Sequence, residues 1–146
     1  MPTTTKRKYG RIAAMTGLWV ITCFEALAMG VIGYRKLFAS DNFGAAFWAR
    51  WFSQWGYPHW FLVVVGVLEL GGGLLLLFPR IAPYAAMVLG VVMLGATVTT
   101  VVHAHDVLAP GLKASDFGPA ASTYHLVLLT IILVARRRNL RFLPAS

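Results

Sequence analysis

Four long apolar segments divide the chain and restrict what it can fold into. They cover about residues 12–38, 58–78, 82–104 and 119–135, and each contains few charged side chains. A helix of about 20 apolar residues crosses the ~30 Å hydrocarbon layer of a membrane. The sequence therefore predicts an all-α integral membrane protein, a single domain (residues 1–146) built as a four-transmembrane-helix bundle.

The charge content supports this interpretation. Apolar residues make up 58% of the chain and charged residues 12%, whereas soluble domains contain about 45–50% and about 25%. This number of charged side chains is too small to cover the surface of a soluble bundle. We therefore expect the outer surface of this protein to contact lipid. The net charge of +8 does not indicate nucleic acid, because the basic residues flank the apolar segments. There they favour membrane boundaries and anionic lipid headgroups.

The distribution of lysine and arginine predicts the orientation. Four spans place both termini and the turn at residues 79–82 on one side of the membrane, and the two longer loops on the other. The first side holds nine of the 13 basic residues; the loops hold the other four, which are Arg35, Lys36, Arg50 and Lys113. Because basic segments stay in the cytoplasm, we expect a bacterial inner-membrane protein with both termini cytoplasmic.

The loop after the first span has an aromatic pattern. Phe43, Phe47, Trp51 and Trp55 recur every four residues, which is typical of one helix face. Residues 43–55 are too few to span the membrane and predict a short amphipathic helix at the membrane interface, where tryptophan is favoured. Two roles stay open: an anchor for the bundle, or a lid whose Trp51 and Trp55 stack on a flat ligand such as a quinone ring.

Two glutamates lie inside apolar segments, which makes each a candidate functional residue. Glu25 lies 11 residues before Lys36 and Glu69 lies 11 residues after Pro58. If the first helix ends and the second begins at the same boundary, both acids lie ~16 Å deep, and Lys36 lies too far above Glu69 to reach it. Each acid is then expected to be protonated or paired. A structural hydrogen bond and a proton-handling or ligand-binding role both stay open.

Histidine and tyrosine gather toward the loop side. His103 ends the third apolar segment, and Tyr124 and His125 lie in the fourth. A pocket opening on that side would have Glu69 as its floor and these three residues as its wall. It would suit a quinone headgroup, although trapped water would satisfy the same groups. No catalytic residue is assigned, and the spacing does not indicate a metal site.

The sequence resembles the DoxX family of bacterial membrane proteins. The resemblance covers about residues 12–135 and is carried by GYRKLF (33–38), GYP (56–58), GVLELGGGLLLL (66–77) and the Pro79–Arg80 turn, followed by Met93 and His103. It implies a four-helix bundle linked to quinone-coupled sulfur or thiol oxidation, with Lys36, Glu69 and His103 as the marked positions. The chain has one cysteine, Cys23, so thiol–disulfide chemistry within the chain is not expected.

Three functions are compatible with these features. The first is an accessory or structural component of a membrane redox complex, or of another membrane complex, which requires partner proteins or further copies of the chain. The second is a quinone-linked oxidoreductase subunit with a ring site in the bundle. The third is a small transporter.

Overall fold

Four long helices form the body of the protein, seen in a computed structural model that describes residues 4–109 and 112–137. They are α1 (Thr4–Leu37), α3 (His59–Leu76), α4 (Ala82–Val102) and α5 (Ala114–Arg136). Each contains a segment long and apolar enough to cross a membrane. The predicted four-helix membrane bundle is confirmed.

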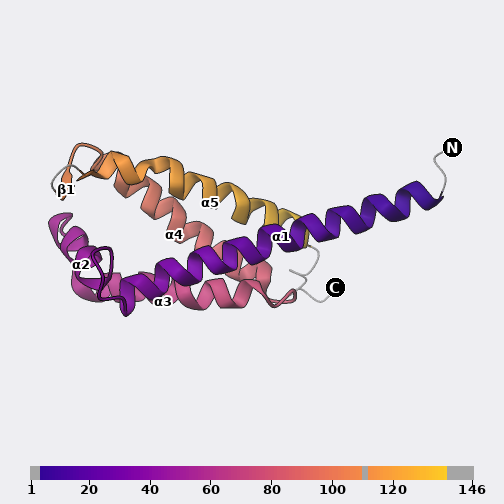
Figure 1. Cartoon of the computed structure of the whole chain (residues 1–146), viewed down its shortest axis with the longest axis horizontal. Helices are drawn as coiled ribbons and strands as arrows, with labels where there is room; N and C mark the ends of the chain where they lie inside the picture. Colours follow the sequence, from indigo (N-terminus) through magenta and orange to yellow (C-terminus); the bar gives the residue numbers. More distant parts are fainter. Residues whose placement is uncertain (1–3, 110–111, 138–146) are drawn as a thin grey trace, which may run out of the picture.

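The helices are arranged as two pairs (Figure 1). α1 packs along α3, and α4 packs along α5, while the short turn between α3 and α4 makes these two helices neighbours. Pro58 is the N-cap of α3, and a proline also lies in the first turn of α4, where the missing N–H of proline costs nothing. The pairs meet through a buried core formed by Met29, Leu76, Leu89, Met93, Leu129 and Ile132.

The outside of the bundle is apolar. Between 17% and 33% of each span is buried within the protein, and large hydrophobic side chains such as Leu74, Val91 and Val127 are exposed. Without a hydrocarbon environment, so much exposed apolar surface would be unfavourable, because burial stabilises by about 25 cal/mol per Å². The arrangement is that of a multi-pass membrane protein.

A short helix, α2 (Ala45–Gln54), lies across one end of the bundle between α1 and α3. It corresponds to the amphipathic helix predicted for residues 43–55, and it buries Trp51 and Phe52. Gly56 has a φ of +78°, a conformation that glycine adopts without strain. That turn reverses the chain from α2 into α3.

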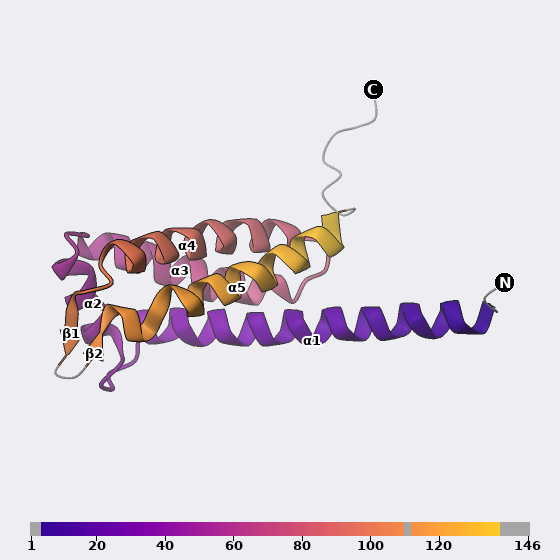
Figure 2. The same ribbon diagram turned by 90° about the horizontal axis from the view of Figure 1, so that it is seen from above.

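We call this end of the bundle the α2 end. It also contains β1 (Val107–Ala109) and β2 (Leu112–Lys113), a short antiparallel pair between α4 and α5 that the sequence did not predict. The opposite end, which we call the terminal end, contains the start of α1, the α3–α4 turn and the end of α5. Figure 2 shows that α1 continues well beyond the other helices there.

Candidate functional site

The inward face of α1 contains most of the buried polar groups. Thr22, Glu25 and Lys36 are all buried, on the same face as Met29. Their spacing of three, four and seven residues places them along one stripe of the helix. This inward stripe runs along α1 from Thr22 to Lys36. Lys36 contacts α3, whereas Glu25 and Thr22 contact α5 at different positions along that helix.

Lys36 pairs with Glu69 of α3. The Lys36 Nζ lies 2.6 Å from Glu69 Oε1, and the two side chains are only 7% and 1% exposed. The expectation that Lys36 lies at the membrane boundary, too far from Glu69 to reach it, is therefore wrong. Glu69 faces into the bundle as predicted, but it does so beside a cation.

Lys36 reaches Glu69 because of the register between α1 and α3. Close contacts at glycine residues establish this register. A Cβ on Gly33 would lie 2.7 Å from the carbonyl oxygen of Gly66, and one on Gly73 would lie 2.8 Å from that of Ala26. Both are too close for any side chain, so only glycine allows the helices to approach so tightly. Glu69 lies between Gly66 and Gly73 on α3, and Lys36 lies about one turn beyond Gly33 on α1.

The same register separates the two acids. Glu25 is adjacent to Ala26 and therefore lies more than one turn nearer the terminal end than Glu69 does. At 1.5 Å per residue the offset is about 10 Å. The prediction that Glu25 and Glu69 lie at the same level is wrong, because α3 begins well beyond the end of α1 instead of at the same height.

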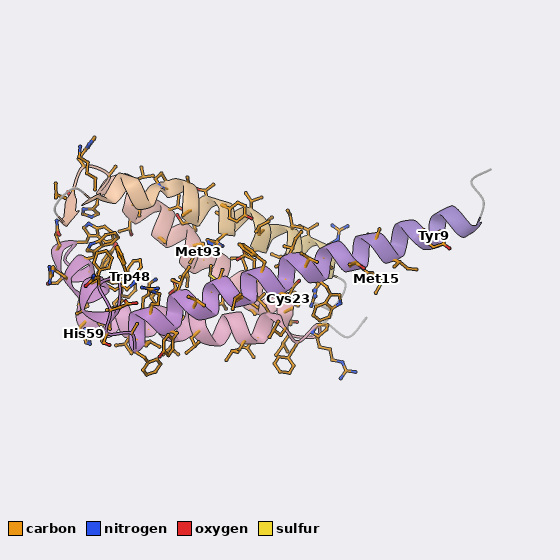
Figure 3. All side chains as sticks on the ribbon, in the orientation of Figure 1. Tyr9, Met15, Cys23, Trp48, His59 and Met93 are labelled. Atoms are coloured by element: carbon orange, nitrogen blue, oxygen red, sulfur yellow. The ribbon has the colours of Figure 1, made fainter. Side chains whose placement is uncertain are left out.

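Aromatic side chains from α2 cover the ion pair. The Lys36 Nζ lies 4.9 Å from the centre of the Trp48 ring and 6.0 Å from that of Phe52. A cation over an aromatic face gains about 0.5–2 kcal/mol. Figure 3 shows Trp48 among the aromatic side chains gathered at the α2 end. Trp51, for which an anchor and a lid role were both open, is buried against Phe47, Trp48 and Trp55.

One oxygen of the carboxylate lacks a hydrogen bond. Glu69 Oε2 is buried and has no hydrogen-bond partner within the described residues, while Oε1 accepts from Lys36. A buried polar atom without a partner costs about 1–3 kcal/mol. We therefore expect Oε2 to interact with a water molecule or with a ligand that carries a hydroxyl group.

A second buried pair joins α1 to α5. His125 Nδ1 lies 3.0 Å and 3.1 Å from the two oxygens of Glu25, which is fully buried. The imidazole stacks on Phe24 at 6.5 Å with an interplanar angle of 15°. Tyr124 is 53% exposed and contacts Phe24 edge-to-face. It therefore lies on the outside of the α1–α5 contact, away from Glu69.

The remaining predicted residues form a separate cluster at the α2 end. His103 Nδ1 lies 2.9 Å from Asp106 Oδ2, and the same oxygen accepts a hydrogen bond of 3.2 Å from Trp55 Nε1. The Trp55 ring stacks on His103 at 5.3 Å. These contacts fasten the end of α2 to the end of α4 and make His103 and Trp55 neighbours.

Sequence reasoning missed a polar contact near the terminal end. Arg136, one of the basic residues that flank the apolar segments, is buried and donates a 3.3 Å hydrogen bond from Nη2 to Thr22 Oγ1. Its guanidinium also lies 4.9 Å from the centre of the Trp19 ring. The available signal was Thr22, which shares the helix stripe of Glu25 and Lys36.

The predicted site residues therefore fall into three groups. Lys36 and Glu69 pair under α2, Glu25 and His125 pair between α1 and α5, and the residues at the loop surface form the third group. Among residues 4–109 and 112–137, no cluster of three His, Cys, Asp or Glu side chains could hold a metal ion. What the first two groups offer instead is proton exchange and hydrogen bonding inside an apolar bundle.

Comparison with known proteins gives a family assignment. The sequence model of the DoxX-like family matches residues 20–135, a range that includes both buried pairs and all four spans except the first turns of α1 and the last residue of α5. The search of curated proteins found no match, and neither did the search of solved structures.

Proposed function

The chain belongs to the DoxX-like family, and we propose that it is an accessory subunit of a quinone-linked membrane redox complex. In this proposal Lys36 and Glu69 bind the quinone ring beneath α2. The observation that carries it is the buried pair itself: an ammonium group and an unpartnered carboxylate oxygen lie side by side under aromatic rings. The family resemblance also implies a link to quinone.

The chemistry of the pair fits the two oxidation states of such a ring. A quinol hydroxyl donates a hydrogen bond, which Glu69 Oε2 is free to accept. A quinone oxygen only accepts, and Lys36 has three N–H donors for this. Trp48 and Phe52, which already face the ammonium, would contact the faces of the ring. The quinone supplies the redox chemistry, and the protein supplies position and a proton acceptor.

The pair is suited to its environment as well. A single carboxylate in hydrocarbon is costly, but here Lys36 compensates its charge, so Glu69 can release and accept a proton without leaving an isolated charge. Tight glycine contacts between α1 and α3 hold the two side chains at a constant separation. An accessory subunit with this site would take up protons while a partner protein carries the electrons.

Binding of a quinone tests the site. The purified protein in lipid nanodiscs would be titrated with decylubiquinone while tryptophan fluorescence is followed, because quinones quench nearby indoles. We expect saturable quenching in the wild type and at least tenfold weaker binding in Glu69→Gln and Lys36→Met. Arg35→Met is the matched control: Arg35 precedes Lys36 but pairs with Asp41 on the surface. Equal affinity in all four proteins would refute the proposed site.

The accessory role needs a separate experiment. The protein would be purified from its native membrane in mild detergent, and the accompanying proteins and lipids would be identified by mass spectrometry. A redox protein recovered in stoichiometric amount supports the proposal. Recovery of the chain alone, with or without bound quinone, would contradict the accessory role and leave a self-contained quinone-binding protein.

A further inference from the structure

We propose that Arg136 binds the phosphate group of an anionic membrane lipid, in a site between α1 and α5 at the terminal end of the bundle. The proposal does not depend on the quinone site, because Lys36 lies in the last turn of α1, toward the α2 end. Three observations carry it: an unpartnered nitrogen of the Arg136 guanidinium, the lack of an acidic partner for its charge, and the level of this group along the spans.

The guanidinium of Arg136 is held in one orientation. Its Nη2 donates a 3.3 Å hydrogen bond to Thr22 Oγ1. The Thr22 hydroxyl in turn donates a 2.7 Å hydrogen bond to the carbonyl oxygen of Leu18, so it presents a lone pair to the arginine. One face of the guanidinium lies 4.9 Å from the centre of the Trp19 ring. These contacts leave Nη1 as the nitrogen available to a further group.

This second nitrogen is buried and lacks an acceptor. The Arg136 side chain is 7% exposed, and Nη1 has no hydrogen-bond partner among residues 4–109 and 112–137. A guanidinium always carries its charge, and all its N–H groups are donors. A buried charged donor without an acceptor is unfavourable, so the site favours an anion. A phosphate group suits it, because arginine donates to two phosphate oxygens at once.

The acidic side chains of the protein do not supply this anion. The chain has five acidic residues. Asp116 lies near the start of α5, twenty residues before Arg136 and therefore about 30 Å away along the helix. The other four already pair with histidine, lysine or arginine elsewhere in the structure; they are Glu25, Asp41, Glu69 and Asp106. The positive charge of Arg136 is therefore open to an anion from outside the chain.

The register of α1 and α3 places the site where the spans end. A Cβ on Gly73 would lie 2.8 Å from the carbonyl oxygen of Ala26. Because the two helices run antiparallel, Leu76, the last residue of α3, comes opposite Thr22 about one turn nearer the terminal end. Arg136 is itself the last residue of α5. The guanidinium therefore lies at the edge of the hydrocarbon layer, which is the level of lipid headgroups.

The surroundings favour a lipid over a soluble phosphate. Trp19 is 39% exposed, and Met15 and Cys23, four residues to either side of it, are exposed on the same stripe of α1. Figure 3 shows Cys23 beside the bundle and Met15 further along α1. This stripe offers an apolar surface to acyl chains, and Trp19 can move aside to admit a headgroup. Arg80 and Arg137, both exposed at the same end, attract anionic lipids to it.

Native mass spectrometry of the purified protein, titrated in detergent with phosphatidylglycerol, tests the site by counting bound lipids. We expect Arg136→Gln to bind the first phosphatidylglycerol molecule about tenfold more weakly than the wild type, which corresponds to one lost hydrogen bond to a charged group. Arg137→Gln is the matched control. It removes the same charge from the next residue, which is exposed, and should change the affinity by less than about twofold.

Each outcome decides the proposal. An equal loss of affinity in the two glutamine variants would show general attraction to a basic surface and would overturn the site, as would wild-type affinity in Arg136→Gln. If Arg136→Gln does not fold, Arg136→Lys replaces it. That variant keeps the charge but loses the planar pair of donors, so it should bind severalfold more weakly, and wild-type affinity would again overturn the site.

A competition experiment identifies the source of the phosphate. Excess sodium phosphate should leave phosphatidylglycerol bound, because a soluble ion gains nothing from the apolar stripe beside Trp19. Phosphatidylcholine should bind more weakly than phosphatidylglycerol, because its ammonium group compensates the phosphate charge. Displacement of the lipid by sodium phosphate, or equal binding of the two lipids, would overturn the assignment to an anionic lipid.

Discussion

Replacing the residues of the buried Lys36–Glu69 pair should show whether the two charges depend on each other. Lys36→Met leaves the Glu69 carboxylate without a cation, and Glu69→Met leaves the Lys36 ammonium without an anion. Both groups are at least nine-tenths buried, and breaking such a pair costs about 3–5 kcal/mol. We expect each single variant to lose about this much free energy of unfolding.

The double variant distinguishes this explanation from simple loss of packing. When both partners become methionine, no buried charge remains, and such replacements are often neutral or stabilising by about 1–4 kcal/mol. We therefore expect Lys36→Met/Glu69→Met to be more stable than either single variant. If the two costs only added, the side chains would contribute independently, and the 2.6 Å contact would not be an energetic unit.

Reversible unfolding in mixed detergent micelles, with increasing dodecyl sulfate, measures these free energies. Arg35→Met is the internal control, because the Arg35–Asp41 pair has a similar length of 2.7 Å but is 37% and 56% exposed. Exposed pairs contribute about 0–1 kcal/mol, so this variant should change little. Single variants that lose less than the Arg35 control would refute the reasoning from burial.

Three further predictions concern the fold and its orientation. Gly33→Ala should cost about 1–3 kcal/mol by overpacking the α1–α3 contact, whereas Gly17→Ala, with nothing within 4 Å of its Cβ position, should cost nothing in the same unfolding assay. Asp106→Asn should loosen α2 by weakening its hydrogen bond from Trp55, which increased quenching of tryptophan fluorescence by iodide would report. A reporter fused after Ser146 should be active only if it is of a kind that works in the cytoplasm, because nine of the 13 basic residues lie on the side of the two termini. Activity of a reporter that works only outside the cytoplasm would contradict the predicted orientation.

The sequence was sufficient for those parts of the fold that depend on local properties. The spans follow from the length and hydropathy of each segment, and α2 follows from the four-residue spacing of its aromatic side chains. That Glu69 faces inward follows from the glycines beside it, which mark a tight helix contact. None of these conclusions requires knowing how far one helix is shifted along another.

Which residue pairs with Glu69 depends on that shift. This explains why the predicted depths of Glu25, Glu69 and Lys36 were wrong. Equal depths for Glu25 and Glu69 assumed that α1 ends where α3 begins. In the structure Leu37, the last residue of α1, packs against Gly66, and α3 extends seven residues beyond that contact to His59, which is about 10 Å. α2 occupies the space above the shorter helix. Lys36 consequently lies within the bundle instead of at its edge.

The partners of the other polar residues depend on which helices are neighbours. α1 lies next to both α3 and α5, so one polar stripe supplies Lys36 to Glu69, Glu25 to His125 and Thr22 to Arg136. Burying a polar group without a partner is costly in a membrane protein. Each polar residue on the inward stripe of one span therefore predicts a complementary residue on a neighbouring span. Arg136 could have been found in this way, because Thr22 is on that stripe and α5 ends beside it.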